Sequence, residues 1–177
     1  ILQIEKALKK EMTEEIYYQM VGDKTASLFS ASCEIGAITS NANVEQQKAM
    51  AIFGEKLGMA FQIRDDLFDI MGTVDAIGKP IGFDVKKNML TLPLIHMFET
   101  VGNNKKKSLQ RKLKQYASKK DIFAIRKLIE SHGGIKYATE QMERISKEAL
   151  DELNIFPDSE YKDALMAVAQ FNLGRES

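Results

Sequence analysis

A run of acidic side chains near the middle of the chain is the strongest sign of chemistry. Arg64-Asp65-Asp66-Leu67-Phe68-Asp69 places three carboxylates within five positions. On a helix, at about 100° per residue, Asp65, Asp66 and Asp69 fall within one arc of roughly 100°. Like charges this close repel one another, and the C-terminal end of a helix disfavours negative charge. Oxygen ligands without nearby His or Cys favour Mg²⁺, which would relieve both penalties, so Asp65, Asp66 and Asp69 are candidate metal ligands.

Two glycine-containing segments carry the positive charge that a phosphorylated ligand would need. Gly22 precedes Lys24-Thr25, which we interpret as the start of a helix and therefore as an anion site. Further on, the loop 78–84 carries Lys79 as a point charge for a diphosphate, and Asp84 is placed to orient metal-bound water. Each segment by itself also fits a plain alternative: a surface lysine beside a helix cap, an ordinary turn, or, for the acidic run, a solvated helix end.

The elements that must position these groups are predicted to be helices. The chain has only three prolines, and its apolar residues recur at steps of three and four without a persistent alternating pattern. Asn43 and Gln46 have the spacing of a capping box. The fold class is therefore an all-α helical bundle. The predicted helices cover residues up to about 19, then 23–39, 43–71, 92–101, 104–117, 119–132, 135–153 and 158–173.

The helix over 43–71 carries an apolar side that would form the wall of a cleft beside the carboxylates. This expected cleft has Phe61 at the border between its apolar side and the acidic arc. The members predicted for the apolar side are Met50, Phe53, Leu57, Ala60, Phe61 and Phe68.

Composition narrows the class of protein. Lys plus Arg equals Asp plus Glu at 25 each, so no overall charge attracts nucleic acid or an anionic membrane. Cys33 is the only cysteine, which suits a reducing compartment, and no apolar stretch is long enough for a membrane span. We expect one cytoplasmic domain over 1–177, without nucleic acid or stable membrane insertion. The basic segment 105–127 is either a solvated outer face or a face for anionic lipid.

Together these motifs resemble those of the polyprenyl (isoprenyl) diphosphate synthase family, the trans-prenyltransferases of the class I terpenoid synthase fold. Lys24-Thr25 matches the family's Lys-Thr motif. Phe61-Gln62 followed by Asp65-Asp66-x-x-Asp69 matches its second aspartate-rich motif, and 78–84 and 91–94 match the stretch that follows. Order and spacing hold over about residues 3–97.

The resemblance implies a reaction and a metal. Family members join isopentenyl diphosphate head to tail to an allylic diphosphate with Mg²⁺. By this resemblance Asp65 is a direct metal ligand, and Asp66 and Asp69 are ligands or hold metal-bound water. All three are expected to act in catalysis, together with Lys24.

The resemblance also assigns the substrate contacts. Lys24 and Lys79 would neutralise the departing diphosphate. Thr25 and Gln62 would supply polar contacts beside it, and Phe61 would line the pocket next to the isopentenyl group. The family further implies a homodimer.

One departure from the family limits these expectations. Members carry a first aspartate-rich motif before the point where this chain begins, whereas Asp65-Asp66 is the only adjacent Asp pair here. The opening Ile1-Leu2-Gln3 resembles the end of the family's Gly-Glu-x-x-Gln element. We expect the chain to be the C-terminal half of such an enzyme, with the N-terminal helices missing and negligible turnover alone.

Two other functions remain open at this stage. The chain can be a non-catalytic helical subunit of a heteromeric prenyltransferase, whose partner supplies the missing half. It can also belong to a terpene cyclase, which shares the fold. Cyclases usually build their second metal motif from Asn or Asp, Ser or Thr, and Glu, and that pattern is not evident here.

Overall fold

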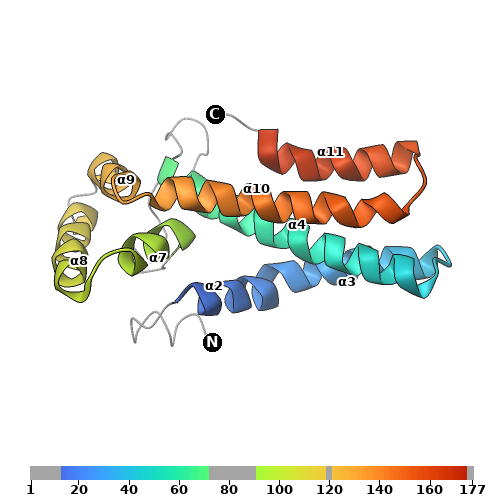
Figure 1. The fold of residues 1–177 in the computed structure, drawn as a ribbon, viewed down its shortest axis with the longest axis horizontal. Helices are drawn as coiled ribbons and strands as arrows, with labels where there is room; N and C mark the ends of the chain where they lie inside the picture. Colours follow the sequence, from blue (N-terminus) through green and yellow to red (C-terminus); the bar gives the residue numbers. More distant parts are fainter. Residues whose placement is uncertain (1–12, 72–90, 119–120, 175–177) are drawn as a thin grey trace. The chain divides into compact units, whose positions relative to one another are not determined.

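The described part of the chain is built from helices. A computed structural model describes residues 13–71, 91–118 and 121–174. Every regular element within these ranges is helical, as predicted (Figure 1). In chain order the elements are α2 (Glu14–Val21), the π-helical turn η1 (Gly22–Ala26), α3 (Ser27–Thr39), α4 (Val44–Met71), α7 (Leu92–Glu99), α8 (Asn103–Ser118), α9 (Ile122–Glu130), α10 (Gly134–Glu152), the 3₁₀ turn η2 (Leu153–Ile155) and α11 (Glu160–Gly174).

The predicted break before Asp23 is wrong. Helix α2 continues through η1 into α3, so the backbone stays helical from Glu14 to Thr39. Within η1 the Ser27 N–H bonds to the Gly22 carbonyl, five residues back, which is the wider π pattern. A single glycine lowers helix propensity by about 1 kcal/mol, and surrounding contacts outweigh a cost of that size. Lys24 and Thr25 therefore lie inside a continuous helical stretch and not at a helix N-terminus.

Helix α4 matches its prediction at both ends. The Asn43 N–H donates to Gln46 Oε1 at 3.0 Å, and the Gln46 N–H donates to Asn43 Oδ1 at 2.9 Å. This reciprocal pair is the predicted capping box. The helix then runs to Met71, so the whole acidic run is helical.

The later helices agree with their predicted bounds to within about three residues. The largest shift is at α9, which was predicted from residue 119 and begins at Ile122. The Asp121 carboxylate accepts the Ala124 N–H at 3.0 Å and so fixes the start of α9. In the described ranges, no helix combines the length and the apolar character that a membrane span requires.

The chain divides into two compact units, the first of residues 1–17 and 65–139 and the second of residues 18–64 and 140–177. The predicted single domain over 1–177 stays a prediction. In the first unit, the end of α4 packs with α7, α8 and α9. The buried side chains of this core are Ile70, Leu94, Met97, Phe98, Leu109, Ile125 and Ile129.

The second unit has its own apolar core among α3, α4, α10 and α11, which run side by side in Figure 1. The buried members are Phe53, Leu57, Ala149, Leu153 and Ala169. Phe29 and Cys33 from α3 pack against them. This core holds α4 at a fixed distance from α3, and that spacing positions the first candidate residues.

Candidate functional site

Two glycines bring α4 into backbone contact with the π-turn and α3. A Cβ built on Gly54 would lie 2.5 Å from the Phe29 carbonyl oxygen. A Cβ on Gly58 would lie 2.7 Å from the Ala26 Cα. Contacts that short leave no room for any side chain, so only glycine permits this approach. The close packing sets the π-turn, with Lys24 and Thr25, directly against α4.

Thr25 and Gln62 meet as a result of this packing. The Thr25 hydroxyl donates to Gln62 Oε1 at 3.1 Å in a partly buried contact between positions 37 apart. The neighbouring Lys24 side chain is exposed to solvent. Two of the predicted substrate-binding residues are therefore brought together, and a third lies next to one of them in the chain.

The predicted apolar side of α4 is divided by the structure. Phe53, Leu57 and Ala60 are buried as expected. The Phe61 side chain is 46% exposed, so it lies at the edge of this buried side, where the sequence placed the border with the acidic arc. Its ring centroid lies 5.7 Å from that of Phe29, at an interplanar angle of 34°. Phe61 follows Ala60 by about 100° around the helix, which is enough to turn it from the core towards solvent.

The three candidate metal ligands have different surroundings. Asp65 is exposed, Asp69 is half-buried and Asp66 is buried. Tyr17 Oη donates to Asp66 Oδ2 at 2.8 Å, and the Leu92 N–H approaches the same oxygen at 3.4 Å. The acidic arc of the sequence is thus not one uniform surface.

The donor set fits magnesium in one binding mode. Among the described residues, no three His, Cys, Asp or Glu side chains lie close enough together to hold a metal ion alone. Mg²⁺ in phosphate-binding sites is held by one or two carboxylates, with waters and substrate phosphates completing the shell. The exposed Asp65 carboxylate offers the hard oxygen ligand that this mode needs. Which carboxylates bind the ion stays a prediction.

The remaining candidates, Lys79 and Asp84, lie outside the described residues. Their assignment to the diphosphate and to metal-bound water stays a prediction.

Arg64 shows a role that the sequence did not indicate. The guanidinium donates through Nη1 to the Phe171 carbonyl at 2.8 Å and lies 5.1 Å from the centroid of the Phe171 ring. The side chain is 7% exposed, and a cation near the C-terminal end of α11 is favourable there. Although it precedes the acidic run directly, Arg64 holds α11 against α4 within the second unit.

Tyr17 is the other residue that sequence reasoning missed. Its hydroxyl contacts Asp66, which is 49 positions away. The helical pattern around Tyr17 predicts only a helix, and no local signal identifies the partner of a buried tyrosine. Only the packed structure reveals this contact.

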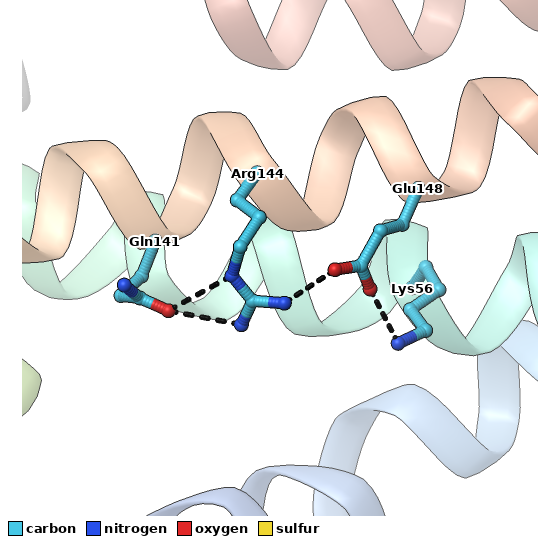
Figure 2. A network of polar contacts seen from close by, with 4 residues as sticks. All are labelled: Lys56, Gln141, Arg144 and Glu148. Carbon is cyan, nitrogen blue, oxygen red and sulfur yellow. Dashed lines mark hydrogen bonds and ion pairs between the residues drawn. The ribbon is translucent and has the colours of Figure 1, made fainter.

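A polar network on α10 fastens the middle of α4 in the second unit (Figure 2). Lys56 Nζ lies 2.6 Å from Glu148 Oε2, and Arg144 pairs with the other oxygen of Glu148. Arg144 also donates to Gln141 Oε1 at 3.1 Å and 2.9 Å. The hydrogen bond from Lys56 holds the pKa of the Glu148 carboxyl below its usual value, and the charges of Lys56 and Arg144 add to this effect.

Comparison with known families and proteins gives consistent matches. A family model described as polyprenyl synthetase matches residues 1–130. The octaprenyl diphosphate synthase of Haemophilus influenzae is 32% identical over 166 residues, which cover 93% of this chain and 50% of that protein. The geranylgeranyl diphosphate synthase of Saccharolobus solfataricus is 34% identical over 168 residues, with the same coverage of 93% and 50%.

A solved structure extends the match to the fold. The crystal structure of geranylgeranyl pyrophosphate synthetase from Pyrococcus horikoshii aligns with a TM-score of 0.88 at 35% identity, over 99% of this chain and 53% of that one. The predicted all-α class is confirmed, and the helices correspond to part of the isoprenyl synthase fold. The chain spans about half the length of the relatives it matches.

Proposed function

Because the chain belongs to the polyprenyl synthetase family, we propose that the intact protein joins isopentenyl diphosphate head to tail to an allylic diphosphate, with Mg²⁺ as cofactor. Both relatives and the solved structure carry the names of prenyl diphosphate synthases, which supports this reaction. The product length and the preferred allylic substrate are left open by this proposal.

The contact between Thr25 and Gln62 is the observation that carries the proposal. The two residues come from motifs 37 positions apart, and the fold joins them in one hydrogen bond. The close approaches at Gly54 and Gly58 already pack α4 against η1 and α3, so this packing does not depend on the polar pair. Its use is to present one hydroxyl and one amide beside the exposed Lys24. Gln62 also lies three positions before Asp65 in α4.

The proposed chemistry distributes tasks among these residues. The allylic carbon–oxygen bond breaks, the diphosphate leaves, and the double bond of isopentenyl diphosphate forms the new carbon–carbon bond. The proton released at the end passes to the departing diphosphate. Bound Mg²⁺ would act as a Lewis acid on that diphosphate. Lys24 and Lys79 would neutralise its charge, while Thr25 and Gln62 orient it and the exposed Phe61 ring lies beside the isopentenyl group.

Further parts of the proposal concern the assembly. We propose a cytoplasmic homodimer, in line with the family and with a single cysteine in the chain. We also propose that the 177-residue chain alone has negligible turnover, because one aspartate-rich helix does not enclose a diphosphate.

The test uses heat stability as a measure of ligand binding. Inorganic diphosphate is added in the presence of Mg²⁺, at about 100 times the dissociation constant of the diphosphate. It should stabilise the intact protein by about 2.7 kcal/mol, which corresponds to an increase in Tm of several degrees. Asp65→Asn should weaken Mg²⁺ binding and so reduce this increase by about half or more at the same ligand concentrations. The matched control is Asp151→Asn, an exposed aspartate on α10, and it should retain the increase.

Turnover is measured in parallel as condensation of labelled isopentenyl diphosphate with an allylic diphosphate. We expect Mg²⁺-dependent product from the intact protein and none from the isolated chain. If Mg²⁺ and diphosphate do not change the Tm of the wild-type protein, the proposal is contradicted. Turnover that appears only after a second, different chain is added would instead favour the non-catalytic subunit of a heteromeric enzyme.

A further inference from the structure

Asp66, the second residue of the acidic motif, is surrounded by protein. Its side chain is 5% exposed and that of Tyr17 is 1% exposed. Tyr17 Oη donates to Asp66 Oδ2 at 2.8 Å. Tyr17, Asp66 and Leu92 all belong to the first unit, so these contacts lie within one compact body. A buried carboxylate is tolerated only when donors like these compensate for lost water.

The contact with Leu92 places Asp66 at the start of α7. Leu92 is the first residue of this helix, and its N–H approaches Asp66 Oδ2 at 3.4 Å. Free N–H groups and the helix dipole make this end favourable for a negative charge. The N-cap residue Thr91 makes no capping bond with its own side chain. Its buried hydroxyl has no hydrogen-bond partner in the described part of the chain. The carboxylate that serves this helix end thus comes from α4.

Asp65 provides the contrast within the same motif. It is the preceding residue, about 100° around α4, and it is exposed. One carboxylate faces solvent, where a substrate can reach it, and the next is directed into contacts with α2 and α7. Identical side chains with such different surroundings are suited to different tasks.

We propose that Asp66 is a positioning residue, which fastens Tyr17 and the start of α7 to the end of α4 and does not itself bind Mg²⁺. Tyr17 is its partner in this task. The statement that Asp66 does not bind Mg²⁺ rests on the proposed function. The statement that Asp66 fastens Tyr17 and α7 rests on the contacts alone. By holding the last turns of α4, Asp66 keeps Asp65 in its exposed orientation.

A double-mutant cycle without any ligand tests whether Asp66 fastens Tyr17. Asp66→Ala and Tyr17→Phe should each lower the Tm by about 4–8 °C, since each removes a buried bond to a charged group. The double variant should lose much less than the sum. Asp66→Asn keeps an acceptor oxygen and should recover part of the loss. Tyr161→Phe, at a tyrosine that is 75% exposed, is the control and should leave the Tm unchanged.

A Mg²⁺ titration of the intact protein with inorganic diphosphate tests whether Asp66 binds Mg²⁺. The Mg²⁺ concentration at half-maximal Tm increase should rise more than tenfold in Asp65→Asn and less than threefold in Asp66→Asn. An equal rise in both variants overturns the proposal, and so does an additive double-mutant cycle. If the wild type does not respond to Mg²⁺, the proposed function fails, and the cycle alone decides whether Asp66 fastens Tyr17.

Discussion

Helix α4 passes through two regions that use polar residues in different ways. In its middle, within the second unit, Gly54 and Gly58 allow close approach of the backbones of α3 and η1, and Gln62 forms a partly buried hydrogen bond with Thr25. At its end, within the first unit, Asp66 is buried against Tyr17. In the first region, backbone packing positions a neutral polar pair, whereas in the second a charged group itself holds the neighbouring helices.

The difference shows that a motif is not a uniform functional unit. Its exposed side chains can reach a substrate, whereas its buried side chains stabilise the packing of the helices. Asp65 and Lys24 are exposed, while Arg64 and Asp66, each adjacent to Asp65, are buried and bonded to protein. Substitutions in the two regions should therefore have different signatures.

The largest effect is expected where backbone packing is tightest. Gly54→Ala should lower the free energy of unfolding by about 3 kcal/mol, because its Cβ would meet the Phe29 carbonyl oxygen at 2.5 Å. Urea unfolding measures the change. The control is Gly36→Ala on α3, which has no neighbour within 4 Å and should gain about 0.5–1 kcal/mol from helix propensity. If Gly54→Ala and Gly36→Ala change the free energy of unfolding equally, close backbone packing does not hold the middle of α4.

A smaller effect is expected from the polar pair itself. Thr25→Val removes the hydroxyl at nearly constant volume and should cost about 1 kcal/mol of stability, since one partly buried hydrogen bond is lost. The side-chain amide resonances of Gln62 should shift in the NMR spectrum. Thr25→Ser should restore both the stability and the Gln62 resonances to those of the wild type. Thr39→Val, at the exposed end of α3, should leave the Gln62 resonances in place. Unchanged Gln62 signals in Thr25→Val would mean that the two residues do not meet in solution.

The smallest effect concerns the ion pair between α4 and α10. The pKa of Glu148 is lowered in the folded state, so its stabilisation is present above the unfolded value near 4.5 and is lost as pH falls through the folded pKa. Both partners are about one-third exposed, which limits the contribution to about 0.5 kcal/mol after solvent screening.

Glu148→Gln should therefore reduce stability more at pH 7 than at pH 3, as measured by urea unfolding at both values. The control Glu143→Gln changes an exposed glutamate on the same helix. A loss of stability in Glu148→Gln that is the same at pH 3 and pH 7 would show that packing, not charge, holds α10 here.

The sequence predicted helices well because the apolar period and the caps are local. The capping box of Asn43 and Gln46 needs only residues three apart, and it forms as expected. The predicted helix start at Asp23 was wrong because Gly22 was taken as a break. Contacts of Ala26 and Phe29 with the α4 glycines hold this segment helical, and such contacts have no local signature.

The sequence by itself determined the helical class, the bounds of most helices and the family, because periodicity, caps and motif spacing all lie along the chain. Tertiary structure alone decided that Thr25 meets Gln62, that Phe61 is exposed, and that Asp66 is buried while Asp65 is not. Burial depends on which helix packs over a given side chain. Neighbours such as Tyr17 and Leu92 are distant in sequence, so no local pattern contains them.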